Sequence, residues 1–105
     1  MHNTGIKMSD IPDPGSRGFS YEGEDYFVVK KDNHLYAYKN SCPHLWVSLD
    51  WVEDQFLDSS NSMIQCANHG ALFVIESGKC VAGPCSGQKL TPLAVAVHGD
   101  FIFIS

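Results

Sequence analysis

The chain has 105 residues, of which 44% are hydrophobic and 18% are charged, a composition that predicts one soluble globular domain over residues 1–105. Its formal net charge of −5 argues against binding to nucleic acid or to an anionic membrane surface, since both are bound mainly through Lys and Arg. No segment approaches the roughly 20 apolar residues of a membrane span, and with no apolar run at the N-terminus the protein is expected to be cytoplasmic.

The first 40 residues predict an irregular start followed by a β-hairpin. Two prolines and a glycine within residues 12–15 indicate an extended, irregular opening segment, with His2 in a mobile terminus. Residues 26–30 and 35–38 are rich in aromatic and β-branched residues, which is typical of strands. Asp32-Asn33 lies between them and tolerates the positive φ of a tight hairpin turn.

The rest of the chain predicts further short strands. Helical periodicity is weak, and its best candidate is a short turn around residues 51–57. Residues 72–75 read as a strand that ends in a turn at Ser77-Gly78. A last hairpin turns at Gly99-Asp100, between strands 94–98 and 101–104. We therefore predict an all-β fold, a small antiparallel sandwich or barrel that carries functional loops at one end.

Two short Cys/His pairs, Cys42-Pro43-His44 and Cys66-Ala67-Asn68-His69, are the strongest functional feature. Twenty-one residues separate His44 from Cys66. A set of two thiolates and two imidazoles suits zinc, or an iron–sulfur cluster in which two His replace two of the four Cys. Four Cys in a short chain could also form disulfides, but the lack of a signal peptide favours metal binding.

The pattern of these loops resembles the Rieske family. The resemblance covers nearly the whole chain and implies a Rieske-type all-β fold with one [2Fe–2S] cluster. It also implies that Cys42 and Cys66 bind one iron and that His44 and His69 bind the other. A Pro-containing loop covers the cluster in this family. The matching segments are Ser9-Asp10-Ile11-Pro12, Cys42-Pro43-His44-Leu45, Cys66-Ala67-Asn68-His69-Gly70-Ala71-Leu72-Phe73 and the presumed cover loop Gly83-Pro84-Cys85.

Four positions distinguish this chain from high-potential Rieske proteins. Those proteins carry an extra, disulfide-forming Cys in each loop, where this chain has Val47 and Asn68. They also place Ser and Tyr hydroxyls near the cluster, where this chain has Ala71 and Phe73. Donors to sulfur raise the potential of such clusters, so we expect a potential on the order of −150 mV.

By this resemblance, the chain is a one-electron carrier and not itself an enzyme. Its implied partners are a flavin-dependent reductase and a terminal oxygenase or similar acceptor. The remaining alternatives are a small Rieske-like subunit of a nitrite reductase or other multi-component oxidoreductase, a redox sensor, and a zinc-stabilised interaction module with a tetrahedral Cys2His2 site.

Three further features have more than one possible role. Cys80 and Cys85 could form a local disulfide or act as redox-sensitive thiols, but in a reducing cytosol they are expected to pack as small hydrophobic residues. Trp46 is expected to pack under its loop, with cluster shielding or docking as the alternative. The long spacer 45–65 is expected to be a solvated insertion, with partner docking as the alternative.

Overall fold

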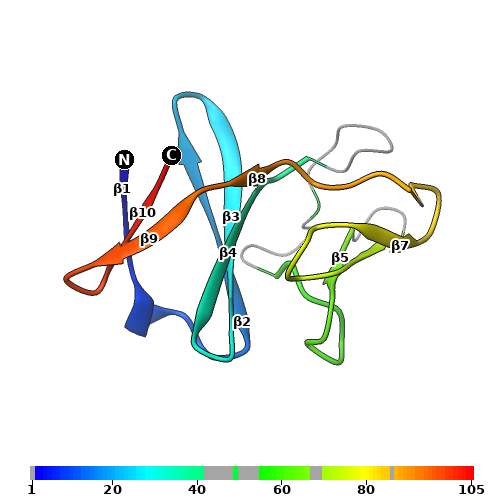
Figure 1. The fold of residues 1–105 in the computed structure, drawn as a ribbon, viewed down its shortest axis with the longest axis horizontal. Helices are drawn as coiled ribbons and strands as arrows, with labels where there is room; N and C mark the ends of the chain where they lie inside the picture. The colour runs from blue at the N-terminus through cyan, green and yellow to red at the C-terminus, as the bar shows by residue number, and fades with distance from the viewer. Residues whose placement is uncertain (1, 42–48, 50–54, 67–69, 86) are drawn as a thin grey trace.

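The computed structural model describes residues 2–41, 49, 55–66, 70–85 and 87–105. In this part of the chain the fold is all-β, as predicted (Figure 1). The strands are β1 (His2–Lys7), β2 (Gly15–Tyr21), β3 (Glu24–Lys31), β4 (His34–Lys39), β5 (Ile64–Gln65), β6 (Leu72–Phe73), β7 (Cys80–Ala82), β8 (Pro92–Leu93), β9 (Val95–His98) and β10 (Phe101–Ile104), with a 3-10 turn, η1 (Met8–Asp10), after β1.

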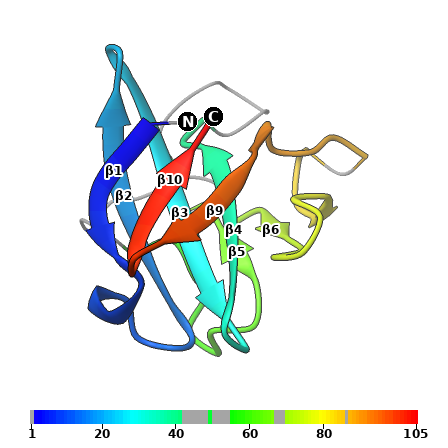
Figure 2. The ribbon, with the colours of Figure 1, turned by 60° about the vertical axis from the view of Figure 1, so that its left-hand side comes forward.

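The strands form three antiparallel sheets, with strand orders β1-β10-β9, β2-β3-β4-β8 and β5-β6-β7. Figures 1 and 2 show the β1-β10-β9 sheet and the β5-β6-β7 sheet on opposite sides of the sheet that contains β3 and β4. The two outer sheets therefore contact different faces of one central sheet.

The alternation of side chains along β3 explains this layered arrangement. Phe27 and Val29 point into the larger core, which includes Phe56, Phe73 and other residues of the β5-β6-β7 side. Val28 lies between them in sequence and packs in the smaller core with Ile6, Ile11 and Ile102. Because successive side chains of a strand point to opposite faces, a continuous apolar run can serve two cores.

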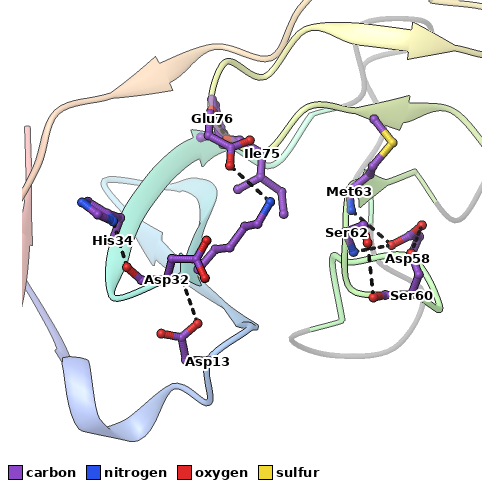
Figure 3. A network of polar contacts seen from close by, with 11 residues as sticks. Asp13, Asp32, His34, Asp58, Ser60, Ser62, Met63, Ile75 and Glu76 are labelled. Atoms are coloured by element: carbon purple, nitrogen blue, oxygen red, sulfur yellow. Dashed lines mark hydrogen bonds and ion pairs between the residues drawn. The ribbon is translucent and has the colours of Figure 1, made fainter.

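Both predicted hairpins are confirmed, and their turns use the expected residues. Asp32 and Asn33 have φ values of 52° and 63°. The Asp13 carboxylate accepts hydrogen bonds from both of their N–H groups, at 2.9 and 2.8 Å (Figure 3 shows Asp13 and Asp32). Gly99 and Asp100 have φ values of 57° and 70°. Two consecutive positive φ values fit the right-handed twist of the flanking strands.

The prediction of an irregular start is only partly confirmed, because residues 11–14 lie outside the strands but β1 precedes them and β2 begins at Gly15. His2 is part of β1, where it pairs with Ile104, and its ring stacks on Tyr21 with the centroids 3.9 Å apart. The strand that completes β1 is β10, about a hundred residues further along the chain. A local sequence pattern gives no information on such a distant partner.

Two shorter predictions also need correction. The predicted helical turn over 51–57 lies partly outside the described residues, and its described end is not helical, because Leu57 forms an antiparallel bridge with Ile64. The strand predicted over 72–75 ends at Phe73. A turn begins at Ile75, and the Gly78 N–H closes it by donating to the Val74 carbonyl at 2.7 Å.

Candidate metal centre

Of the four predicted ligands, Cys66 lies in the described part of the chain, whereas Cys42, His44 and His69 lie outside it, as does Trp46. No group of three or more His, Cys, Asp and Glu side chains suited to a metal ion is found among the described residues. The described residues do show how the chain holds the two ends of each loop that carries these ligands.

The second loop is a closed hairpin connection between β5 and β6. Cys66 directly follows β5 and is fully buried. Its N–H donates to the Ala71 carbonyl at 2.9 Å, and the Gly70 N–H donates back to the Cys66 carbonyl at 2.8 Å. Gly70 has a φ of 68°, a conformation that glycine adopts without steric cost. The hydrogen bonds at both ends fix the backbone on either side of residues 67–69.

The ends of the first loop are held by Asn40, which the sequence analysis did not single out. Its side-chain oxygen Oδ1 accepts a hydrogen bond from the Leu49 N–H at 2.8 Å. Its own N–H donates to the Asp25 carbonyl at 2.9 Å, next to the end of β4. Leu49 is fully buried in the larger core. These contacts tie both ends of the segment 41–48 to the central sheet.

The predicted cover loop lies against the second loop. Gly83 has a φ of 96°, and a Cβ atom built on it would lie 2.8 Å from the Ala71 Cα and 3.1 Å from its Cβ. A side chain at this position would overlap Ala71, so the two loops pack backbone against backbone. The segment 83–85 thus lies beside the loop that begins at Cys66, and its role in covering the cluster stays a prediction.

The side chains of Cys80 and Cys85 are buried rather than exposed to solvent. Both pack in the larger core, as predicted for small hydrophobic residues, and neither forms a disulfide. The Cys80 thiol also donates to the Ala82 carbonyl, with sulfur and oxygen 3.3 Å apart. These contacts separate the two cysteines from the exposed, reactive thiols expected of a redox sensor.

The described part of the site fits a soft metal group. A buried thiol such as Cys66 becomes a strong, soft ligand once it loses its proton. The surroundings of Cys66 include Ala71 and Phe73, both fully buried and both without a hydroxyl group. The loops thus provide a sulfur donor in an apolar environment, with the cover loop close by.

Residues 58–63 of the long spacer form a hydrogen-bonded turn around one carboxylate. Asp58 accepts hydrogen bonds from the Ser60 hydroxyl and from the N–H groups of Ser62 and Met63, at 2.9 to 3.2 Å (Figure 3). Desolvation opposes the charged form, but these hydrogen bonds outweigh it and lower the pKa of Asp58. Asn61 completes the turn with a φ of 58°.

A buried hydrogen bond from a tyrosine hydroxyl joins β4 of the central sheet to the turn that follows β6. The Tyr38 hydroxyl donates to the Ile75 carbonyl at 2.6 Å. Tyr38 is only 3% exposed, and burial together with the nearby Glu76 and Tyr36 raises its pKa to about 12.

None of the helices in the described part of the chain is long and apolar enough to cross a membrane.

Comparison with proteins of known structure shows that the fold is similar to that of two ferredoxins. The chain superposes on the ferredoxin of carbazole 1,9a-dioxygenase from Nocardioides aromaticivorans with a TM-score of 0.79, at 22% identity, over 100% of this chain and 95% of the ferredoxin. It superposes on the Sphingomonas yanoikuyae B1 ferredoxin with a TM-score of 0.76, at 19% identity, over 99% and 95% of the two chains. These identities establish similarity of fold.

Curated relatives include the cytochrome b6-f complex iron-sulfur subunits of Chlorobaculum thiosulfatiphilum and Chlorobaculum tepidum. The first is 31% identical over 94% of this chain, and the second is 29% identical over 72% of it. The chain spans only 50% and 38% of the lengths of these two proteins.

The family comparison covers almost the whole chain. The Rieske [2Fe-2S] domain model matches residues 4–98. This match and the all-β fold agree on one assignment. The chain belongs to the Rieske [2Fe-2S] domain family.

Proposed function

We propose that Cys42, His44, Cys66 and His69 bind the cluster, with the two Cys on one iron and the two His on the other. When bound, the cluster takes up and releases one electron at a time. The observation that carries this assignment is the closed hairpin loop that begins at the buried Cys66 and ends at Ala71, against the cover loop. Two such loops, each with one thiolate and one imidazole, would supply two ligands to each iron.

The residues around Cys66 have separate tasks in this proposal. Asn40 and the Cys66–Ala71 hydrogen bond hold the loop ends, so that the ligands need little reorganisation when the oxidation state changes. The close contact between Gly83 and Ala71 keeps water away from the Cys66 side of the loop. Residues 1–105 form the single domain that carries this site.

We further propose that the chain accepts electrons from a flavin-dependent reductase and passes them to a terminal oxygenase. Support for the acceptor comes from two matching structures that are complexes of oxygenase and ferredoxin in carbazole 1,9a-dioxygenase. A cytoplasmic location is part of the same proposal, and no disulfide joins the described cysteines Cys66, Cys80 and Cys85, which fits a reducing compartment. Cell fractionation tests the location.

The ligand assignment is tested by comparing two buried cysteines. We expect Cys66→Ser to abolish the visible absorption and the EPR signal of the dithionite-reduced protein, and to remove most of its iron. Cys80→Ala is the matched control, because Cys80 is equally buried but is not a proposed ligand. It should retain the spectra and about two iron atoms per chain. Substitution of His44 or His69 should also change the spectrum.

Three results would contradict the assignment. One is an unchanged spectrum in a folded Cys66→Ser variant, with folding checked by far-UV circular dichroism. Another is loss of the spectrum in Cys80→Ala but not in Cys66→Ser. The third is a colourless wild-type protein with stoichiometric zinc, which would support the interaction module.

A second candidate function follows from the sequence relatives. The 31% identity to a cytochrome b6-f complex iron-sulfur subunit over 94% of this chain favours a role as the cluster domain of a subunit in a larger redox complex. The reduction potential separates the two candidates. A value of several hundred millivolts positive favours this second role, whereas a value near the lower end of the Rieske range favours the carrier for an oxygenase.

A further inference from the structure

The positive charge of this chain is unevenly distributed. Residues 77–99 contain Lys79 and Lys89 but no Asp or Glu, whereas all twelve acidic residues and the other five basic residues lie elsewhere. A protein with a net charge of −5 thus has one stretch that carries the opposite sign. Such a local reversal of sign can steer a partner of complementary charge to one face.

The two lysines lie directly opposite each other on neighbouring segments. Lys79 and Lys89 form an isolated antiparallel bridge, and both are exposed. Like charges opposite each other destabilise a β-structure, and the ion pairs in the described part of the chain, Lys31–Glu76 and Lys39–Glu24, neutralise neither of them. The backbone hydrogen bonds on either side of the bridge run from the Cys80 N–H to the Gln88 carbonyl at 2.8 Å and from the Leu90 N–H to the Gly78 carbonyl at 2.9 Å.

This hydrogen-bond pattern brings the two side chains close together. A bridge flanked by hydrogen bonds, rather than spanned by them, is a non-hydrogen-bonded pair, in which the Cα atoms lie only about 4.5 Å apart. The unfavourable pair is therefore built into the geometry of the hairpin. An acidic partner would offset the repulsion, because it would place negative charge between the two ammonium groups.

An open cavity and an exposed apolar side chain accompany the lysines. The cavity has a volume of about 370 Å³ and is lined by Ser77, Lys79, Gly87, Gln88 and Lys89. Val81 is 49% exposed, the highest value among the large hydrophobic residues of the described chain. It lies where the register between β6 and β7 shifts, and such bulges re-aim a side chain. Charge beside an apolar contact is typical of a protein interface.

The same hairpin contacts the proposed cluster site. Beyond Val81, the chain reaches Gly83, which packs against Ala71, and the Ala71 carbonyl accepts the hydrogen bond from the Cys66 N–H. We propose that the face formed by Lys79, Val81 and Lys89 is the docking surface for an acidic patch on the protein that exchanges electrons with the cluster. This inference rests on the proposed electron-carrier function and adds the face and the charge of the partner.

The first test is carbodiimide cross-linking of the holoprotein to a hexaglutamate peptide, which serves as the acidic probe. We expect the cross-links, mapped by mass spectrometry, to be at least threefold more frequent at Lys79 and Lys89 than at Lys7, Lys30, Lys31 and Lys39. The preference should weaken at 200 mM salt, because the Debye length shortens. An even distribution over all lysines would overturn the proposal. The proposal would also be overturned if 10 mM phosphate, added at constant ionic strength, abolished the cross-links at Lys79 and Lys89. That result would indicate a site for small anions.

The second test measures electron transfer to an anionic acceptor. Hexacyanoferrate(III) takes one electron from the dithionite-reduced holoprotein and becomes hexacyanoferrate(II). We expect Lys79→Gln/Lys89→Gln to slow this step at least threefold at low salt. The control variant Lys7→Gln/Arg17→Gln removes the same charge from exposed positions on β1 and β2 and should slow it less than twofold.

The outcomes separate the docking face from the function itself. Equal slowing in both variants would mean that only net charge matters, and no slowing in either would mean that the lysines play no part. Either result overturns the docking face while the carrier function stands. A wild-type protein without a reducible visible spectrum would instead contradict the proposed function.

Discussion

At the scale of single residues, identical side chains acquire different roles from their positions. Cys66 and Cys80 are both fully buried cysteines of the larger core. Cys66 begins a closed loop that contains a histidine three residues later, whereas Cys80 opens a strand and its thiol bonds to a carbonyl of that strand. Burial alone therefore does not distinguish the two cysteines, and our proposal of Cys66 as a ligand rests on the loop that follows it.

The residues beside the cluster site predict a low potential. Ala71 and Phe73 are buried and lack hydroxyl groups, so neither can donate a side-chain hydrogen bond to cluster sulfur. We expect protein-film voltammetry of the holoprotein to give about −150 mV. Phe73→Tyr, which adds a hydroxyl, should make the potential more positive. A clearly positive potential in the wild-type protein would contradict this prediction.

The contact between the cover loop and the second loop predicts that a single methyl group added at Gly83 destabilises the folded state. Gly83→Ala should lower the free energy of unfolding, because the new Cβ overlaps Ala71 and the backbone keeps a positive φ. Gly87→Ala is the matched control, with a φ of 91° and no atom within 4 Å of the added Cβ. We expect Gly83→Ala to cost about 1–3 kcal/mol more than the control in urea unfolding. Equal costs would show that the two loops can separate without loss.

At the scale of elements, tight turns and hairpin closures define the site more than long strands do. β5, β6 and β8 have only two residues each, and β7 has three. Their positions depend on contacts outside the strands, such as the Asn40 side chain on Leu49 and the Tyr38 hydroxyl on the Ile75 carbonyl. The loops are thus tied to the long strands β3 and β4 by a few specific hydrogen bonds.

The Tyr38 contact between β4 and the turn after β6 predicts a loss of stability in alkali. Burial raises the pKa of Tyr38 from the usual tyrosine value of 10.0 to about 12, so the folded state keeps the proton that the unfolded state releases. The contribution of the Tyr38 hydroxyl to the free energy of unfolding is therefore complete below about pH 10 and disappears as the pH rises towards 12. Tyr38→Phe should cost about 1 kcal/mol at pH 8, because the Ile75 carbonyl loses its donor.

The pH dependence is measured as the difference between the two proteins. Urea midpoints of the wild type and of Tyr38→Phe should converge between pH 10 and pH 11.5. A constant difference between the two urea midpoints over this range would contradict the prediction. It would show that Tyr38 does not lose its proton at a lower pH in the unfolded state than in the folded state.

At the scale of the whole molecule, the central sheet links two cores that lie on its opposite faces. The smaller core joins β1 and β10 to Val28, and the larger core joins the loop-bearing side to Phe27 and Val29. The N- and C-terminal strands are paired and lie on the far side of the central sheet from β5 and β7 (Figure 1). Loss of either core would expose one face of β3.

This arrangement predicts that residues 1–105 unfold as one unit. Val28→Ala lies in the core remote from the cluster loops, yet it should shift the cluster-absorbance transition and the circular dichroism transition equally, by about 1–3 kcal/mol. Val97→Ala, at a position 42% exposed, is the control and should cost less than about 0.5 kcal/mol. Two separate transitions in the wild type would contradict the single domain.

The accuracy of the sequence predictions followed the range of the interactions involved. The hairpins at Asp32-Asn33 and Gly99-Asp100 were predicted correctly, because the residues that permit a positive φ lie within the turn itself. β1 was missed because β10, its partner, lies at the other end of the chain. The strand expected over 72–75 was too long, because the turn closed by Gly78 interrupts it.

The sequence by itself determined the family and the cluster type, and it predicted the four ligands, because the identity and spacing of Cys and His residues specify a donor set. Only the tertiary structure decided which elements support this set. Asn40 closes the first loop, Gly83 rests on Ala71, and Lys79 faces Lys89, each through residues that are not neighbours along the chain. Ligand chemistry is carried by residue type over a few positions, whereas loop support and surface charge depend on packing between distant segments.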